Sequence, residues 1–175
     1  MEVNERGVAN MDIKYYDFST PIGKMFIFFS NKGIVYLSLP NNRKDDIVDY
    51  VKKKYGATEE VERNQYDFHK QIIKYLKGQL KELSLPLDLQ GTEFQKKVWK
   101  ELLNIPYGEI RTYKDIAKSI GNPKGYRAVG GALNKNPIPI IVPCHRVVGS
   151  KGQLVGFAGG LNLKQKLLEL EKKKL

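Results

Sequence analysis

A chain of 175 residues with 41% hydrophobic residues can bury a core for one domain or two small ones, which excludes wholesale disorder. Its single cysteine and two histidines exclude an internal disulfide and a structural zinc cluster. The net charge of +11 lies almost entirely in residues 91–175, which carry 16 basic and 6 acidic residues against 14 and 13 in residues 1–90. A basic half of this kind suits a polyanion such as nucleic acid.

The first predicted elements are three strands at 13–18, 23–30 and 33–39, rich in aromatic and β-branched residues. Short turn sequences separate them, so we expect a small antiparallel sheet. Two helices follow, at 43–56 and 66–80, each with one apolar face. We assign no chemistry to this half, and His69 is interpreted as a structural or surface residue.

Residues 83–90 read as an extended linker because proline interrupts the helical pattern. We therefore divide the chain into an N-terminal domain, 1–88, and a second domain, 89–175. Thr92 and Gln95 have the spacing of a capping box at the start of the next helix. Trp99 lies on the apolar stripe of that helix, and we expect it in the core. The fold class is α/β (α+β), with a mostly helical second domain.

Residues 111–137 predict two short helices joined by a tight turn, the pattern of a helix-turn-helix. Thr112 is placed to cap the first helix and Gly121 to end it, while Asn122 and Pro123 suit the start of the second. The second helix is small and apolar ("AVGGAL"), which fits either close packing inside the protein or close approach to a DNA groove. The basic residues around it favour DNA.

Cys144 lies at the end of the apolar run "IPIIVP", directly before His145. A buried thiol is mostly protonated and needs a base or a positive neighbour to become a nucleophile. Adjacent side chains of an extended segment point to opposite sides, so contact with His145 requires a water molecule or a local twist. In the terminal segment, which has few acidic residues, Glu169 and Glu171 are the acids available to orient the imidazole. The alternative is that Cys144 is a small buried hydrophobic residue.

The segment "PCHRV" (143–147) resembles the active-site signature of the O6-alkylguanine-DNA alkyltransferases, which are suicide DNA-repair proteins. The similarity extends over "GNPKGYRAVGGALNKNPIPIIVPCHRVV", "FQKKVW", "IPYGEIRTY" and "GGLNLKQKLLELE". It is strong over residues 91–171 and weaker over the first half, whose expected layout is like that of ribonuclease H. The resemblance implies irreversible transfer of a methyl or alkyl group from O6-alkylguanine in double-stranded DNA, and possible action on O4-alkylthymine.

The resemblance implies a role for each residue of the expected catalytic set. Cys144 is the alkyl acceptor, and His145 acts on it through a water while Glu171 holds the imidazole. Asn136 is the hinge before the active-site loop. Tyr113 contacts the target base or its phosphate and is a candidate donor to the departing guanine.

On the DNA side, the resemblance implies that the second helix enters the minor groove and that Arg127 fills the gap left by a flipped nucleotide. The further residues expected at the DNA are Tyr113, Lys124, Ala128, Gly130 and Gly131. The residues expected at the base pocket are Pro139, Val147, Phe157, Ala158 and Gly159. Many relatives have a tyrosine followed by serine or arginine where this chain has Phe157 and Ala158. Phe157 keeps an aromatic ring at the pocket wall but lacks the hydroxyl, and Ala158 offers only its backbone N–H. The range of bulky alkyl groups that the pocket accepts is therefore left open.

Three classes of function compete. A suicide alkyltransferase needs the cysteine and explains the basic half. A non-catalytic lesion-binding protein of the alkyltransferase-like type would lack the cysteine. A cysteine hydrolase with a Cys–His–Glu set would leave the basic half and the helix pair without a purpose. We therefore predict the alkyltransferase, a cytoplasmic monomer without cofactor, metal or membrane association, since the chain shows no signal segment and no apolar stretch long enough to span a bilayer.

Overall fold

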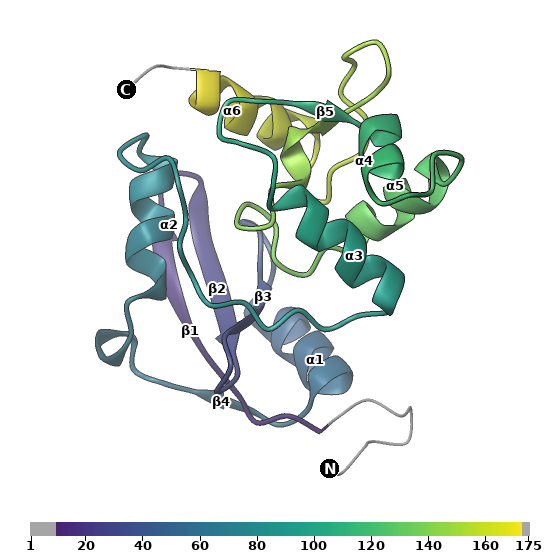
Figure 1. Cartoon of the computed structure of the whole chain (residues 1–175). Helices are drawn as coiled ribbons and strands as arrows, with labels where there is room; N and C mark the ends of the chain where they lie inside the picture. The colour runs from purple at the N-terminus through teal and green to yellow at the C-terminus, as the bar shows by residue number, and fades with distance from the viewer. Residues whose placement is uncertain (1–9, 173–175) are drawn as a thin grey trace.

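A computed structural model describes residues 10–172 of the chain. Its N-terminal part is built on a four-stranded sheet of order β3-β2-β1-β4 (Figure 1). The bounds of these strands are β1 Ile13–Thr20, β2 Gly23–Phe29, β3 Ile34–Leu37 and β4 Thr58–Glu60. The first three pair antiparallel as predicted.

The sheet is mixed rather than antiparallel, because β4 pairs in parallel with β1. Its three residues are polar and partly exposed, so no strand pattern marks them in the sequence. The strand forms through its pairing with β1 after a helical crossover, which returns the chain in the same direction. The expectation of a purely antiparallel sheet is therefore wrong at this edge.

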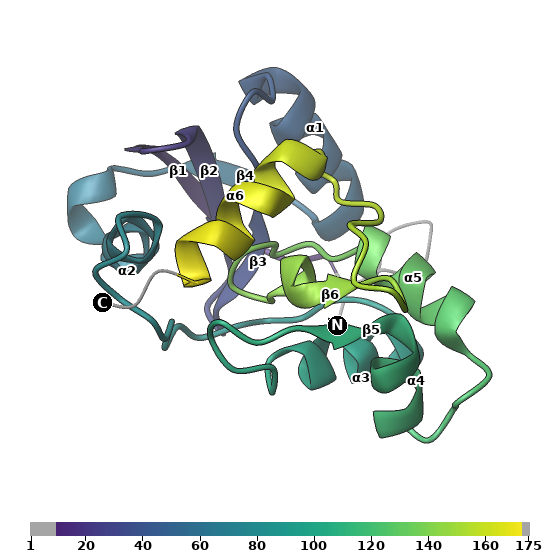
Figure 2. The same cartoon turned by 90° about the horizontal axis from the view of Figure 1, so that it is seen from above.

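Helices cover both faces of the sheet. Helix α1 (Lys44–Tyr55) packs on the face that carries Tyr15 and Phe28, and it ends at Gly56, as predicted. Helix α2 (Phe68–Leu76) packs on the opposite face (Figure 2) and is shorter than the predicted 66–80. With both faces covered, β2 is buried at five consecutive positions.

The linker after α2 runs along the edge of the sheet. The Ile34 N–H donates to the Pro86 carbonyl, and the Asp88 N–H donates to the Ile34 carbonyl. Helix α3 (Glu93–Leu102) then begins with the predicted capping box of Thr92 and Gln95. The Trp99 indole donates to the Ala132 carbonyl at 2.9 Å, which confirms Trp99 as a core residue.

Helices α4 (Tyr113–Ser119) and α5 (Tyr126–Asn134) form the predicted pair. Thr112 caps α4 through a capping box with Asp115. The second helix, however, begins three residues later than expected. Gly121 adopts a φ of 79°, and the Asn122 N–H donates back to the Ala117 carbonyl, so Asn122 belongs to the Schellman motif that ends α4.

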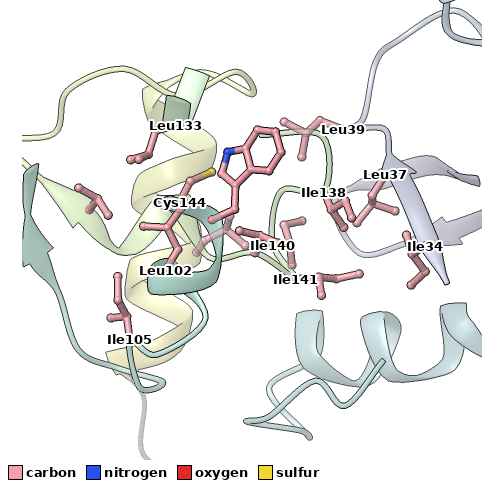
Figure 3. Packing of buried hydrophobic residues seen from close by; sticks show 14 of the residues in the cluster. Ile34, Leu37, Leu39, Leu102, Ile105, Leu133, Ile138, Ile140, Ile141 and Cys144 are labelled. Carbon is pink, nitrogen blue, oxygen red and sulfur yellow. The ribbon is translucent and has the colours of Figure 1, made fainter. Parts of the chain in front are cut away.

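Four of the remaining elements are short: the 3-10 helices η1 (Arg63–Gln65) and η2 (Cys144–Arg146) and the parallel strands β5 (Arg111–Thr112) and β6 (Val147–Val148). The fifth is helix α6 (Leu161–Lys172), which has 12 residues. One hydrophobic cluster joins the two parts of the chain. Figure 3 shows Ile34, Leu37 and Leu39 beside the Ile138–Ile141 loop, with Cys144 on its far side. The sheet thus supports the loop that carries the thiol.

No helix among residues 10–172 is both long enough and apolar enough to span a bilayer.

Candidate active site

The loop before Cys144 is fixed by the side chain of Asn136. Its amide nitrogen donates to the Val142 carbonyl at 2.9 Å, and its oxygen accepts from the Ile138 N–H at 3.0 Å. Between them, Ile140 has a φ of 74°, a left-handed conformation that a β-branched residue rarely adopts. This conformation persists because the buried core and the two hydrogen bonds over-determine the loop.

Cys144 begins η2 and its side chain is buried. Burial raises the pKa of its thiol, whereas a hydrogen bond from the Asn136 side chain and the charge of Lys164 lower it. In a 3-10 turn, successive side chains are about 120° apart rather than on opposite sides. The expected obstacle to cooperation between Cys144 and His145, an extended backbone, is therefore absent at this turn.

His145 is fully buried and is held by Glu171 from α6, whose Oε1 lies 2.8 Å from its Nε2. A carboxylate can only accept, so Nε2 carries the hydrogen and Nδ1 is left as an acceptor. Nδ1 is buried and has no hydrogen-bond partner among the residues that the structure describes. Burial lowers the pKa of His145, which keeps the imidazole neutral and able to take a proton.

Glu171 accepts hydrogen bonds from three side chains. Arg146 donates to it through Nε and through Nη2, the latter at 2.7 Å, and the Tyr75 hydroxyl donates at 2.5 Å. Burial alone raises the pKa of Glu171, but the bonds from His145, Arg146 and Tyr75 outweigh it and lower the pKa to about 2. Glu169, the other acid considered, is exposed and bonds to Gln165.

Sequence reasoning missed Tyr75, Arg146 and Lys164. Tyr75 comes from α2, in the half to which no chemistry was assigned. Lys164 is buried on α6 in one stripe with Leu167 and Glu171, at spacings of three and seven residues. Charged residues at the apolar positions of a helix were the available signal.

A small pocket opens beside the thiol. Its lining residues are Leu133, Asn134, Asn136, Pro139, Cys144, Gly156, Phe157 and Ala158. Three of the residues expected there, Pro139, Phe157 and Ala158, line it. Val147 and Gly159 do not: Val147 is buried in β6, and Gly159 faces Leu163 and Leu39. The free volume is about 10 Å³, room for about one water molecule and not for a purine base.

A larger cavity of about 300 Å³ adjoins this pocket and shares Asn134 and Gly156 with it. Its other lining residues are Tyr113, Lys114, Tyr126, Gly130, Ser150 and Val155. The Tyr113 hydroxyl donates to the Val155 carbonyl at 2.9 Å and so closes the helix pair against the loop after β6. Burial raises the pKa of Tyr113, which keeps its hydroxyl protonated.

Helix α5 has one exposed face. Arg127, Ala128 and Gly131 are exposed, and a Cβ added at Gly131 would meet nothing within 4 Å. Gly130, by contrast, faces the Tyr113 ring. Lys124 is exposed in the turn before α5. The packing of the chain therefore does not require a small residue at Gly131, and close approach of another molecule gives a reason for one.

Both parts of the chain are similar to known proteins. Residues 13–89 match the family model for the ribonuclease-like domain of 6-O-methylguanine DNA methyltransferase, and residues 93–173 match the model for its DNA-binding domain. The methylated-DNA–protein-cysteine methyltransferase of Methanosarcina barkeri is 45% identical over 164 residues, which cover 92% of this chain and 99% of that protein.

Solved structures of O6-methylguanine methyltransferases are also similar to this chain. The Mycobacterium tuberculosis O6-methylguanine methyltransferase superposes with a TM-score of 0.77 and 40% identity over 91% of this chain and 93% of the other. A second structure, M. tuberculosis OGT in complex with DNA, has a TM-score of 0.75, 40% identity and coverage of 91% and 92%.

Proposed function

The chain belongs to the 6-O-methylguanine DNA methyltransferase family, and we propose that Cys144 is the residue that accepts the alkyl group. The protein is a methylated-DNA–protein-cysteine methyltransferase that repairs double-stranded DNA by transferring the group to itself. The observation that supports Cys144 is the buried thiol followed by a neutral imidazole whose Nδ1 has no partner in the described residues and whose Nε2 is held by a carboxylate.

Activation of the thiol follows from this arrangement. Nδ1 of His145 takes the thiol proton through a bridging water, and Glu171 stabilises the imidazolium that forms. The thiolate then attacks the O6-methyl carbon in line with the carbon–oxygen bond. A sulfur–carbon bond forms, the bond from carbon to O6 breaks, and its electron pair stays on guanine, which is neutralised by a proton. Tyr113 is the proposed donor of that proton, since its hydroxyl is protonated and lies at the cavity beside the pocket.

The reacting base must leave the helix stack, because a buried thiol cannot reach O6 inside a duplex. We propose that α4 and α5 act as a helix-turn-helix whose second helix presses on the minor groove. Arg127 would fill the gap in the stack, while Ala128 and Gly131 allow the backbone to approach closely. Lys124 would contact the phosphate backbone. Gly130 contributes indirectly, by letting Tyr113 lie against α5.

The flipped base would enter through the 300 Å³ cavity and displace the loop at Val155–Ala158 to reach Cys144. Phe157 and Pro139 would then form apolar walls, and the backbone N–H of Ala158 remains as a donor to the base. The Tyr113–Val155 hydrogen bond is the contact that must open first. Val147 and Gly159 would act by supporting the walls rather than by touching the base.

We further propose that the protein works as a cytoplasmic monomer without a cofactor, and that 1–88 and 89–175 are its two domains. The lone thiol, which a reducing compartment protects, supports the location. The catalytic set, apart from Tyr75, lies in the second domain.

Intact-mass spectrometry tests the proposal. The wild-type chain and Cys144→Ser are each mixed with an equimolar duplex that contains one O6-methylguanine. We expect the wild type to gain one methyl mass on the Cys144 peptide and the variant to gain none while still binding the duplex. Tight lesion binding without any mass change in the wild type would instead indicate a recognition protein.

A further inference from the structure

Asn134 and Gly156 lie on the boundary between the pocket beside the thiol and the adjoining cavity of about 300 Å³. They are the two residues that the linings of both spaces share. Asn134 is the last residue of α5, and Gly156 belongs to the loop between β6 and α6. A Cβ built at Gly156 would lie 3.6 Å from Oδ1 of Asn134, so the Asn134 side chain faces the loop across this boundary.

The remaining walls of the pocket have little freedom to move. Leu133 is buried in the hydrophobic core, and Figure 3 shows it beside Cys144. Asn136 is held by its two hydrogen bonds to the active-site loop, and Pro139 is buried in that loop. The Phe157 ring packs against the core cluster. Enlarging a close-packed wall of this kind requires strain in the surrounding core.

Asn134 differs from these residues in its freedom. It is exposed, and its amide makes no hydrogen bond to any other residue in the range 10–172. An exposed side chain of this kind changes rotamer on a timescale of nanoseconds or less. Gly156 has no side chain to move, and Ala158, although exposed, has only a methyl group. Asn134 is therefore the side chain of the pocket wall that can swing into solvent without disturbing the core.

The size of the pocket gives this freedom a consequence. The free volume beside the thiol is about 10 Å³, which suits one small group. In an O6-alkyl group larger than methyl, the carbon bonded to O6 must still reach the sulfur of Cys144. The rest of the group then needs space outside the pocket, and the boundary at Asn134 is the side on which the cavity offers it.

We propose that Asn134 is a specificity-determining residue for the alkyl transfer: its side chain is the movable part of the boundary and sets how large a group can be transferred to Cys144. The proposal rests on the function proposed for Cys144. A methyl group reacts with Asn134 in place, whereas a benzyl group reacts only after the Asn134 side chain has turned away from Gly156.

The first experiment uses two reagents that differ in bulk and needs no DNA. Rates of Cys144 alkylation by iodoacetamide and by N-benzyliodoacetamide are measured by intact mass, which reports this residue alone because the chain has one cysteine. In each reaction the sulfur displaces iodide, so the ratio of the two rates cancels any change in thiol reactivity. The variants are Asn134→Ala and Asn134→Gln, with Lys135→Ala as the matched control. Lys135 is the next residue, is exposed and lines neither space.

We expect the benzyl-to-small ratio to rise by about tenfold in Asn134→Ala, the range that one added or removed methylene produces in a binding pocket. It should fall in Asn134→Gln, whose longer side chain reaches further across the boundary, and stay unchanged in Lys135→Ala. A ratio that is equal in the wild type and both Asn134 variants would overturn the proposal. An equal change in both rates would also overturn it, because that result shows an effect independent of size.

The second experiment compares single-turnover transfer from duplexes that contain O6-methylguanine or O6-benzylguanine. The ratio of the two transfer rates should change in the same direction in each variant. A ratio that responds with the reagents but not with the duplexes would contradict the proposal, since the alkyl group would then lie elsewhere in the bound state. A wild type that reacts with both reagents but takes no group from either duplex would overturn the function proposed for Cys144, and the reagent ratios would still decide whether Asn134 limits access to the sulfur.

Discussion

His145 Nε2 lies 2.8 Å from Oε1 of Glu171, although the two residues are 26 positions apart and on different elements. This hydrogen bond sets the tautomer of the imidazole and leaves Nδ1 as an acceptor, the atom that we propose as the base for the thiol. It is also the point at which three parts of the chain meet, since η2, α6 and, through Tyr75, α2 all contribute to it.

The first prediction concerns Glu171→Gln. The amide cannot stabilise an imidazolium, and its NH₂ group can hold the opposite tautomer, so we expect the single-turnover transfer rate to fall by about 100-fold or more. The variant should also lose about 3 kcal/mol or more of stability, because Arg146 is left buried without its counter-charge. Rapid-quench kinetics with a methylated duplex measures the first effect and urea unfolding the second. Glu169→Gln, on the exposed side of the same helix, should change neither.

The second prediction is a loss of stability in acid. In the folded chain the pKa of Glu171 is about 2, below its ordinary value of 4.5. The stability that the ionised carboxylate contributes is therefore fully present above pH 4.5 and is lost as the pH falls towards 2. The folded pKa of His145 is also lowered, so the unfolded chain takes up a proton first as the pH falls through 6.5. Both effects lower the free energy of unfolding as the pH falls. Urea unfolding from pH 7 to pH 3.5 should show a continuous decline, and a stability that is flat or rises over this range would contradict the buried network.

The third prediction concerns Tyr75→Phe. Glu171 loses one of its donors, and we expect a loss of about 1.5–3 kcal/mol of stability for a hydrogen bond to a charged group, together with a slower transfer rate. Tyr107→Phe is the matched control, because the Tyr107 hydroxyl donates to the Leu170 carbonyl and not to the carboxylate. Equal transfer rates for the two variants would show that Tyr75 has only a packing role.

The fourth prediction tests the exposed face of α5. Gly131→Ala should raise the stability of the fold by up to about 1 kcal/mol, because glycine disfavours a helix interior and the site has room for a Cβ. Gly131→Leu should leave the fold intact and lower the affinity for duplex DNA by about tenfold or more, because its side chain would hold the helix away from the groove. Fluorescence anisotropy measures binding, with iodoacetamide alkylation of Cys144 as a control for the intact site. Undiminished DNA binding by Gly131→Leu would place the DNA on another face.

Local signals in the sequence predicted much of the fold. The capping boxes at Thr92 and Thr112 are both formed, because each depends on residues only three positions apart. The start of α5 was mispredicted for an equally local reason: Asn122 can cap a helix or complete a Schellman motif, and the φ of Gly121 selects the second. Strand β4 could not be predicted, since it is defined by its pairing with a strand more than 40 residues earlier.

The contiguous motif of the site was predicted from the sequence, whereas the buried side chains that surround it were mostly missed. Cys144 and His145 belong to a contiguous motif. Glu171 was expected at the imidazole from the family resemblance. Tyr75 was missed, because it is 96 residues from Glu171 and no pattern in either helix indicates that the two meet. Lys164 was missed because a lysine in a helix usually lies on the solvated face, and only its position in the buried stripe distinguishes it.

The most direct test of the account counts methyl groups transferred per chain. A tenfold excess of duplex containing O6-[³H-methyl]guanine is incubated with the protein, and protein-bound and released label are followed to completion. We predict a plateau of one methyl group per chain, all of it on Cys144, with no further loss from the DNA. Loss of more than one methyl group per chain would show turnover, and a plateau at zero would show that the thiol does not react; either result would contradict self-alkylation at Cys144.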